Sequence, residues 1–522
     1  MSWDQARRLR LSEQHEWFRG RAGVASHSTG VASRDAGVAS RDAGVRATPM
    51  LLTTAEAPAG RLVRPVGRHL AFGADPTSQV SVAWQVPAPV RSPFLRIGES
   101  PSDLSQRIAA EVRTVAALRT DGCAQPSASG PTGERHYLHA MAERLEPGRT
   151  YHYSVGHQGA DDRRAGWTGT FTTAPSDRQP FTFTAFGDQG VSPAAVGMPA
   201  LIQAQAPAFH LHAGDISYAD SSGRGLVTDS YDSQVWDSFF AQIEPAAARV
   251  PWQIAVGNHE MEAWYSADGY GAQRARFDFP GHPASSTPDT YYSLRYGNVG
   301  IVSLDANDVS YEIPANRGYS GGAQTSWLAG TLAALRGDPD VDFVVAFFHH
   351  CGYCTCTAHG SEGGVREHWA PLFDQYEVDL VINGHNHIFE RTDPLKGGSP
   401  TGAAPAGSTI RPATEGTTYI TAGSGGVGLY EFPASDSYAG RVSDADAVAS
   451  HVSEADDATA RETVTWSRVR YTGYCLLVLD SRPGQWPGAD STLTVRGLAA
   501  DGAEIDRITL ARSAGLISAT SY

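Results

Sequence analysis

Apolar stretches in this chain of 522 residues end in acid, amide and imidazole side chains at five places. One apolar stretch, residues 208–211, continues as His212-Ala213-Gly214-Asp215-Ile216-Ser217-Tyr218. Such a stretch is typical of a buried strand. A carboxylate after the strand can place one oxygen on each of two cations, which is how hydrolytic two-metal sites are bridged. Taken alone, the stretch is better explained by a helix-capping aspartate beside a buried tyrosine. Whether Asp215 and Tyr218 are metal ligands therefore depends on the residues at the other four places.

The other four strand ends carry the same kinds of side chain. They are Gly187-Asp188-Gln189-Gly190 after residues 181–186, Gly257-Asn258-His259-Glu260 after 252–256, His349-His350 after 343–348, and Gly384-His385-Asn386-His387 after 378–383. In an open α/β sheet, ligands gather beyond the carboxyl ends of the strands, so five ends can converge on one site. A single histidine after a strand is a weak signal. All five ends together favour a functional site.

The mixture of side chains indicates which ions this site would hold. Carboxylate, imidazole and amide ligands together suit first-row transition metals, whereas Ca²⁺ and Mg²⁺ prefer oxygen ligands throughout. Free tyrosine has a pKa of about 10, so a phenolate ligand needs a strongly acidic cation to lose its proton. The presence of Tyr218 in the set therefore indicates a trivalent iron.

The elements that must position these residues follow a long non-catalytic region. Residues 1–58 contain a seven-residue repeat with glycine in every copy, which predicts disorder rather than a coiled coil. Residues 60–176 show short alternating strands, turn signals and a buried type of tryptophan, Trp84, which predict a β-sandwich of the fibronectin type III kind. From residue 181 to about 515, apolar strands alternate with helix-compatible segments such as 233–243, 324–335 and 366–376. This is the layered α/β pattern.

Composition limits the partners. The formal net charge is -15 and no Lys/Arg-rich run occurs, which argues against nucleic acid. No apolar stretch approaches the ~20 residues of a transmembrane segment. Arg7-Arg8 lacks a following apolar region, so no export signal is recognisable in this sequence. Five cysteines do not form a disulfide scaffold, and the oligomeric state stays open.

Together, the five motifs resemble those of the purple acid phosphatases, a branch of the metallophosphoesterases. Other branches carry Asp-x-His at the first motif, whereas position 190 here is glycine and Tyr218 replaces the lost imidazole. Residues 69–73 and 80–84 are similar to the N-terminal domain of plant and actinobacterial members, and residues 366–373 and 390–391 also resemble actinobacterial ones. The resemblance implies an α+β multidomain protein, with a β-sandwich followed by a four-layer αββα metallophosphoesterase domain.

The resemblance also implies a dinuclear site. A ferric ion would be held by Asp188, Tyr218 and His387, a divalent ion (Fe, Zn or Mn) by Asn258, His349 and His385, and both by the bridging Asp215. The implied enzyme is an acid phosphatase that hydrolyses small-molecule phosphate monoesters through attack by a metal-bound hydroxide. His259 matches a family histidine that contacts the phosphate and assists the leaving group. The family is mainly secreted or lysosomal, so secretion or a place in the cell envelope is expected.

Two other functions stay open. One is a phosphodiesterase or nucleotide phosphatase of the same fold, because the sequence does not define the leaving-group pocket. The other is a non-catalytic surface-binding protein in which the β-sandwich does the binding. The second alternative expects at least one replaced ligand, and every ligand position is occupied by the expected residue type.

The region after residue 348 leaves several assignments open. His349 rather than His350 is the expected ligand, because the strand 341–348 then has the length usual in the family. His359 is a second candidate for catalysis, although the plant enzymes carry a pair of histidines there and the first corresponds to Ala358. Cys351, Cys354 and Cys356 form a disulfide or a thiolate metal site in one interpretation, and an apolar loop with free thiols in the other.

Overall fold

Short alternating strands build the first part of the chain as a β-sandwich. The computed structural model describes residues 62–122, 127–128, 133–160, 167–281, 290–433, 447–456, 458–486 and 488–513. The predicted disordered segment 1–58 lies outside these residues. One antiparallel sheet has the order β1 (Val66–Phe72), β2 (Val80–Val86), β8 (Glu134–Ala142), β5 (Glu111–Ala116). The other has the order β10 (Thr168–Thr172), β9 (Thr150–Gly156), β3 (Phe94–Gly98), β4 (Gln106–Ala109). Trp84 is buried in this part.

Two seven-stranded mixed sheets build the second part. The first has the order β14 (Trp252–Ile254), β12 (His210–His212), β11 (Phe181–Phe186), β27 (Cys475–Arg482), β28 (Asp490–Ala499), β29 (Glu504–Ser513), β22 (Thr409–Ile410). The second has the order β15 (Tyr292–Tyr296), β16 (Val299–Ser303), β17 (Phe343–Phe348), β18 (Leu380–Asn383), β23 (Thr418–Ala422), β19 (Phe389–Thr392), β26 (Ser467–Tyr471).

Smaller elements connect these sheets. The helices are α2 (Met198–Ala204), α3 (Gln234–Ala247), α4 (Gly271–Arg276), α5 (Ala323–Gly337), α6 (Gly363–His368), α7 (Ala370–Gln375) and α8 (Pro412–Glu415). The 3₁₀ turns are η1 (Ala195–Gly197), η2 (Asn258–Glu260), η3 (Ala306–Asp308) and η4 (Pro314–Asn316). The short strands are β6 (Leu118–Asp121), β7 (Ser127–Ala128), β13 (Ser230–Asp232), β20 (Leu395–Lys396), β21 (Ser399–Pro400), β24 (Val448–Ser453) and β25 (Thr459–Val464).

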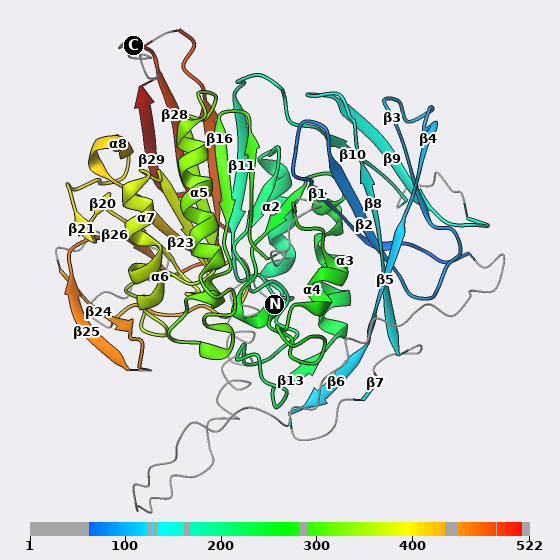
Figure 1. Ribbon diagram of the computed structural model, residues 1–522, viewed down its shortest axis with the longest axis horizontal. Helices are drawn as coiled ribbons and strands as arrows, with labels where there is room; N and C mark the ends of the chain where they lie inside the picture. Colours follow the sequence, from blue (N-terminus) through cyan, green and yellow to red (C-terminus); the bar gives the residue numbers. More distant parts are fainter. Residues whose placement is uncertain are drawn as a thin grey trace, which may run out of the picture. The chain divides into compact units, whose positions relative to one another are not determined.

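The apolar residues divide the second part into four layers, α, β, β and α (Figure 1). Ile202 of α2 and Phe239 of α3 pack with Val478 on the outer face of the first sheet. Leu328 of α5 and Phe373 of α7 belong to the cluster on the outer face of the second sheet. The inner faces of both sheets share one core, since each sheet buries apolar side chains against the other. The predicted fold class is therefore confirmed.

The sheet topology brings the polar strand ends to one edge. β11, β12 and β14 pair in parallel in the first sheet, and β16, β17, β18 and β23 pair in parallel in the second. Parallel neighbours end at the same side of a sheet, so the residues that follow them are neighbours in space. Backbone hydrogen bonds join these ends directly, from Asp188 N to Gly214 O at 3.0 Å and from Gly384 N to His349 O at 3.0 Å.

Polar contacts join the β-sandwich to α3 and α4. Arg68 of β1 donates to Glu244 of α3 with an N···O distance of 2.7 Å. His139 of β8 lies between the carboxylate of Asp278, at 2.9 Å, and the carbonyl oxygen of Ala275, at 2.9 Å. These partly or fully buried contacts attach the sandwich to α3 and to the end of α4.

The structure differs from the sequence prediction in one helix. Residues 366–376 were expected to form one helix, but α6 ends at His368 and α7 begins at Ala370. Pro371 explains the break, because it has no N–H to donate to the carbonyl oxygen of Glu367 and its ring clashes with that carbonyl, whereas a proline is tolerated in the first turn of a new helix. Among the described residues, no helix combines the length and hydropathy needed to cross a membrane.

Candidate metal centre

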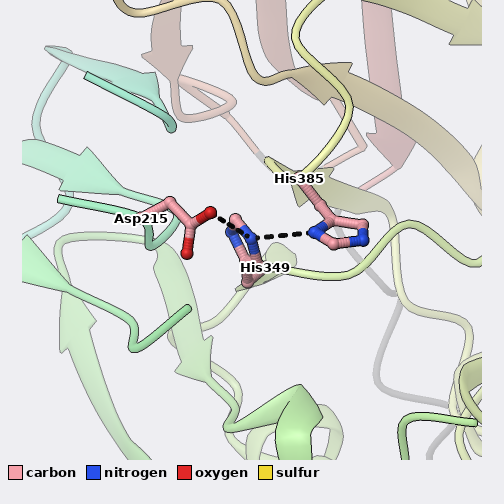
Figure 2. Close-up of side chains that lie close together, drawn as sticks. All are labelled: Asp215, His349 and His385. Carbon is pink, nitrogen blue, oxygen red and sulfur yellow. Dashed lines mark hydrogen bonds and ion pairs between the residues drawn. The ribbon is translucent and has the colours of Figure 1, made fainter. Parts of the chain in front are cut away.

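Three predicted ligands from three different strand ends lie in contact. Asp215 Oδ2 is 3.1 Å from His349 Nε2, and His349 Nε2 is 3.1 Å from His385 Nδ1 (Figure 2). Asn258 Oδ1 is 3.1 Å from the same His385 nitrogen. All four side chains are buried. Their separations are those of donor atoms around a single ion with bonds of about 2.1 Å.

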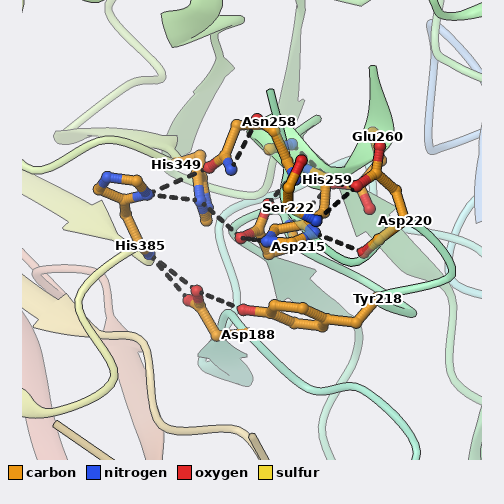
Figure 3. A network of polar contacts seen from close by, with 12 residues as sticks. Asp188, Asp215, Tyr218, Asp220, Ser222, Asn258, His259, Glu260, His349 and His385 are labelled. Atoms are coloured by element: carbon orange, nitrogen blue, oxygen red, sulfur yellow. Dashed lines mark hydrogen bonds and ion pairs between the residues drawn. The ribbon is translucent and has the colours of Figure 1, made fainter. Parts of the chain in front are cut away.

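A second group contains the other three predicted ligands. Tyr218 Oη lies 3.1 Å from Asp188 Oδ1 and 3.0 Å from His387 Nε2. His387 Nε2 is 3.5 Å from Asp188 Oδ1. Both oxygens of Asp188 also accept from the backbone N–H of His385, at 3.0 and 2.9 Å, which connects the two groups (Figure 3). Carboxylate, phenol and imidazole therefore face one another as the predicted iron site requires.

In each predicted histidine ligand, the ring nitrogen that faces away from the donor groups lies against a hydrogen-bond acceptor. His349 Nδ1 lies 2.9 Å from the carbonyl oxygen of Ala213, and His387 Nδ1 lies 2.7 Å from that of Gly428. A nitrogen that faces a carbonyl oxygen must carry a proton, so the other nitrogen is the one that would present a lone pair to a bound ion. His385 uses the opposite nitrogens, with Nδ1 in the cluster and Nε2 against Glu312 at 3.1 Å. The donor set thus fits a pair of metal ions.

The backbone is strained at four of the predicted ligands. Asp188, Asp215, Tyr218 and His385 have φ of 59°, 50°, 60° and 67°. Left-handed backbone costs of order 1–3 kcal/mol at a non-glycine residue and tends to occur at functional sites. Glycine is required at position 384, because a Cβ there would lie 2.4 Å from Asp188 Oδ2. The strand ends are therefore shaped to aim these side chains at one place.

A buried glutamate, Glu260, joins two of the motifs. Its carboxylate accepts from the backbone N–H groups of Asp215 and Ile216, both at 2.8 Å, and of Gly257 at 2.7 Å (Figure 3). Burial and then the charge of Asp215 raise the pKa of Glu260. The sequence analysis gave Glu260 no role. Its position three residues after Gly257 is the capping-box position of η2 and could have indicated one.

The pKa values of the two buried aspartates, Asp188 and Asp215, shift in opposite directions. Burial raises the pKa of Asp188 well above its usual value. Burial also disfavours the charged form of Asp215, but the neighbouring His349 imidazolium outweighs this effect and holds the pKa of Asp215 well below its usual value. Burial, followed by Asp188, raises the pKa of Tyr218 well above 10. A Tyr218 phenolate therefore requires a bound cation.

His259 lies beside both groups. Its Nδ1 is 2.8 Å from the carbonyl oxygen of Asp220, and its ring packs on that of Tyr218 with a centroid distance of 4.3 Å. Its Nε2 faces Asp215 Oδ2 at 3.9 Å. Asp220 is itself held in place by N–H groups of Ser222 and Gly223. The structure thus directs one His259 nitrogen toward the candidate metal centre.

His359 reaches the centre from its outer side. Its ring packs on that of His385 at 4.2 Å, and its Nδ1 lies 2.5 Å from Glu312 Oε1. Its Nε2 is 3.4 Å from Tyr430 Oη, and the Tyr430 ring stacks on His387 at 3.9 Å. Neither Glu312 nor Tyr430 was predicted from the sequence. No periodicity or spacing marks them, because both come from irregular loops.

His350 and the cysteines adjoin the donor groups but contribute no donor atom to them. His350 is buried and its ring packs on that of His385, but neither nitrogen has a hydrogen-bond partner within the described part of the chain. Cys351, Cys354 and Cys356 are buried, free and packed with Ile388 and Phe432. No group of described residues that could hold a metal includes a thiol. This arrangement is that of an apolar loop with free thiols.

We expect acid to destabilise the fold through His212. It is buried on β12, neither nitrogen has a hydrogen-bond partner among the described residues, and burial lowers its pKa to about 3. This folded-state pKa lies below the unfolded value of about 6.5. Between pH 6.5 and pH 3 the imidazole is therefore protonated in the unfolded state but not in the folded state, so the free energy of unfolding falls as the pH falls through this range. We expect His212→Leu to abolish this loss, so that the free energy of unfolding falls by up to about 3 kcal/mol less between pH 7 and pH 4 than it does in the wild type.

Thermal unfolding of wild type, His212→Leu and His152→Leu at pH 7 and pH 4 measures this effect. His152 is half-buried on β9 of the sandwich and serves as the control. The fall in Tm between pH 7 and pH 4 should be smaller in His212→Leu than in the other two proteins. An equal fall in all three would show that His212 does not titrate on unfolding.

Comparisons with known proteins agree with this geometry. Residues 65–174 match the family model of the purple acid phosphatase N-terminal domain, and residues 195–389 match that of the calcineurin-like phosphoesterases. An uncharacterised protein of Mycobacterium tuberculosis is 31% identical over 491 residues, covering 86% of this chain and 87% of the relative. Purple acid phosphatase 18 of Arabidopsis thaliana is 28% identical over 274 residues, covering 52% of this chain and 56% of the relative.

A solved structure shares the fold. The purple acid phosphatase PPD1 from yellow lupin seeds superposes with a TM-score of 0.64 at 21% identity, covering 86% of this chain and 75% of the lupin chain. Its likeness concerns the architecture, whereas the phosphoesterase family model spans four of the five strand-end motifs, those between residues 212 and 387. On these matches, the chain belongs to the purple acid phosphatase family of the calcineurin-like metallophosphoesterases.

Proposed function

We propose that the protein is a binuclear metal-dependent acid phosphatase that hydrolyses small-molecule phosphate monoesters, with Fe(III) and a divalent Fe, Zn or Mn as its ions. One observation supports this most strongly. All seven predicted ligands are present, and their donor atoms gather in two groups at the shared edge of the two sheets. The non-catalytic alternative expects a replaced ligand, so the complete set favours an enzyme.

Each group of residues has a distinct task in this proposal. Bound ions would polarise the phosphoryl oxygens and supply an ionised water at neutral or acidic pH. Asp188, Tyr218 and His387 would hold the ferric ion, and Asn258, His349 and His385 the divalent ion, with Asp215 between them. Tyr218 distinguishes this set from that of a zinc or manganese enzyme, because a phenolate suits a trivalent ion.

His259 is suited to donate a proton to the leaving group. The Asp220 carbonyl oxygen holds a proton on Nδ1, which leaves Nε2 directed toward Asp215 and the space in front of it. Burial lowers the pKa of His259, and the Asp215 charge opposes this effect. In acid, a protonated Nε2 can donate to a phosphate oxygen or to the leaving oxygen. The proposal therefore predicts activity that rises as His259 becomes protonated.

The Tyr218→Phe variant tests the metal assignment. We expect the metal-loaded wild type to contain iron and to show a broad visible band from charge transfer between tyrosinate and Fe(III). The variant should lose that band but keep its fold, because only a phenol oxygen is removed. Metal analysis, a visible spectrum and far-ultraviolet circular dichroism measure these outcomes. A wild type without iron and without the band would contradict the ferric site and leave a zinc or manganese phosphoesterase.

Substrate choice tests the activity separately. Wild-type protein would be assayed at pH 5 and pH 7 on an aryl phosphate monoester, an aryl phosphodiester and ATP. The proposal expects the monoester to have the highest kcat/KM. A higher kcat/KM for the diester or for ATP would instead support the phosphodiesterase or nucleotide phosphatase alternative.

A further inference from the structure

The partly exposed carboxylate of Glu312 contacts two histidines of the candidate centre. Its Oε2 is 3.1 Å from His385 Nε2, and its Oε1 is 2.5 Å from His359 Nδ1. The two imidazole rings pack on each other at a centroid distance of 4.2 Å. Glu312 lies between η3 and η4, outside the five strand-end motifs. Its carboxylate therefore connects a predicted metal ligand to a predicted catalytic histidine.

The contact with His385 determines which nitrogen of that ring can bind a metal. His385 Nδ1 is the nitrogen on the side of the other predicted ligands, since it lies 3.1 Å from both Asn258 Oδ1 and His349 Nε2. To bind a metal ion there, this nitrogen would have to present a lone pair. The proton must then lie on Nε2, where Glu312 accepts it. The same task falls to backbone carbonyl oxygens at His349 and His387. Only His385 depends on a side chain for it among these three predicted ligands.

The loop that carries Glu312 is itself firmly held. Glu362 is buried, with 3% of its surface exposed, and its Oε1 accepts from the backbone N–H of Tyr311 at 2.7 Å. Its Oε2 accepts from the backbone N–H of Glu312 at 3.2 Å and from Ser310 Oγ at 3.0 Å. Ser453 of the β24–β25 hairpin donates to the same carboxylate at 2.8 Å. Glu312 is thus placed before any ligand binds, as a preorganised site requires.

We propose that Glu312 is a positioning residue, which fixes the tautomer and orientation of His385 for the divalent metal and holds His359 toward the leaving group. The role of Glu312 toward His359 rests on the proposed function, and its role behind His385 rests on the predicted ligand set. A carboxylate behind a metal-bound imidazole commonly changes metal affinity 10–100-fold when removed. Because the same carboxylate also holds His359, its loss should change both metal retention and leaving-group dependence.

Two substitutions at Glu312 separate these effects. Alanine removes both acceptors. Glutamine keeps one acceptor oxygen, which can still receive the His385 proton, but its amide NH₂ then faces His359 Nδ1 and forces the His359 proton to Nε2. Glu367→Gln is the matched control, because Glu367 accepts from Tyr311 Oη at 2.6 Å beside the same loop and has no contact with either histidine.

The experiment compares wild type, Glu312→Ala, Glu312→Gln and Glu367→Gln. Divalent metal content after dialysis against a graded series of chelator concentrations measures retention, and circular dichroism checks the fold. Glu312→Ala should lose the divalent ion about 10–100-fold more readily, while Glu312→Gln should stay within about threefold of wild type. With saturating metal, both variants should lower kcat for phenyl phosphate more than for p-nitrophenyl phosphate, because the better leaving group needs less proton donation.

Two results would overturn the inference. One is metal retention by folded Glu312→Ala equal to that of Glu367→Gln, and the other is an equal fall of kcat on both aryl esters in Glu312→Gln. Failure of the proposed function looks different. In that case the wild type would hold both ions but hydrolyse no phosphate ester, and the retention series alone would still support or overturn the role of Glu312 behind His385.

Discussion

Replacement of Asp215 by asparagine should lower kcat for phosphate monoester hydrolysis by roughly 10³-fold or more, a loss of at least about 4 kcal/mol in transition-state stabilisation. The substitution keeps the shape but removes the charge of the residue proposed to bridge the two ions. Asp215 is buried, and its oxygens contact His349 Nε2 at 3.1 Å and the backbone N–H of His259 at 3.0 Å. The change should therefore affect the proposed divalent site and the proposed catalytic histidine, His259, together.

Steady-state kinetics with metal analysis measures this loss, and Asp501→Asn is the control. Asp501 is exposed in the turn between β28 and β29, where its side chain accepts from the backbone N–H of Ala503. We expect Asp215→Asn to retain fewer metal ions than the control while circular dichroism stays unchanged. An Asp215→Asn protein with full metal content and more than a tenth of wild-type kcat would contradict a bridging role.

Removal of Glu262 should lower the free energy of unfolding by about 3–5 kcal/mol, the usual effect of leaving a buried charge without its partner. Glu262 pairs with Arg276 at 2.8 Å, and the two side chains are 0% and 1% exposed. Glu262 also accepts from Trp236 Nε1 at 2.7 Å, and the Arg276 guanidinium lies over the Trp236 ring at 4.2 Å. Glu262→Ala would leave the buried Arg276, at the end of α4, charged and without its carboxylate partner.

An exposed ion pair provides the matched control for this stability effect. Arg507 and Glu504 pair at 2.6 Å on β29, but the two side chains are 49% and 39% exposed. Solvent screens such pairs, so Arg507→Ala should cost less than about 1 kcal/mol. Urea unfolding followed by tryptophan fluorescence measures both variants. Equal midpoints for Glu262→Ala and wild type would show that the buried pair contributes little net stability.

The local sequence was sufficient to predict the fold class and to place the candidate ligands at strand ends. An apolar run followed by glycine and a polar residue specifies a buried strand and its end, and parallel strands bring such ends to one edge. Asp188, Asp215 and His385 follow this rule, since each comes directly after a glycine and within three residues of the end of β11, β12 or β18. The replacement of an imidazole by Gly190 was also visible in the sequence, and it gave Tyr218 its predicted place.

Tertiary structure alone decided which groups orient those ligands. Glu312 is 73 residues from His385 along the chain, and Tyr430 is 71 residues from His359. Both lie in irregular loops, whose paths depend on packing against distant elements and carry no periodic signal. The choice of nitrogen in each imidazole was likewise undetermined, because it depends on which acceptor faces the other side of the ring. The sequence by itself determined the candidate donor atoms, and the folded loops determined how each candidate is held.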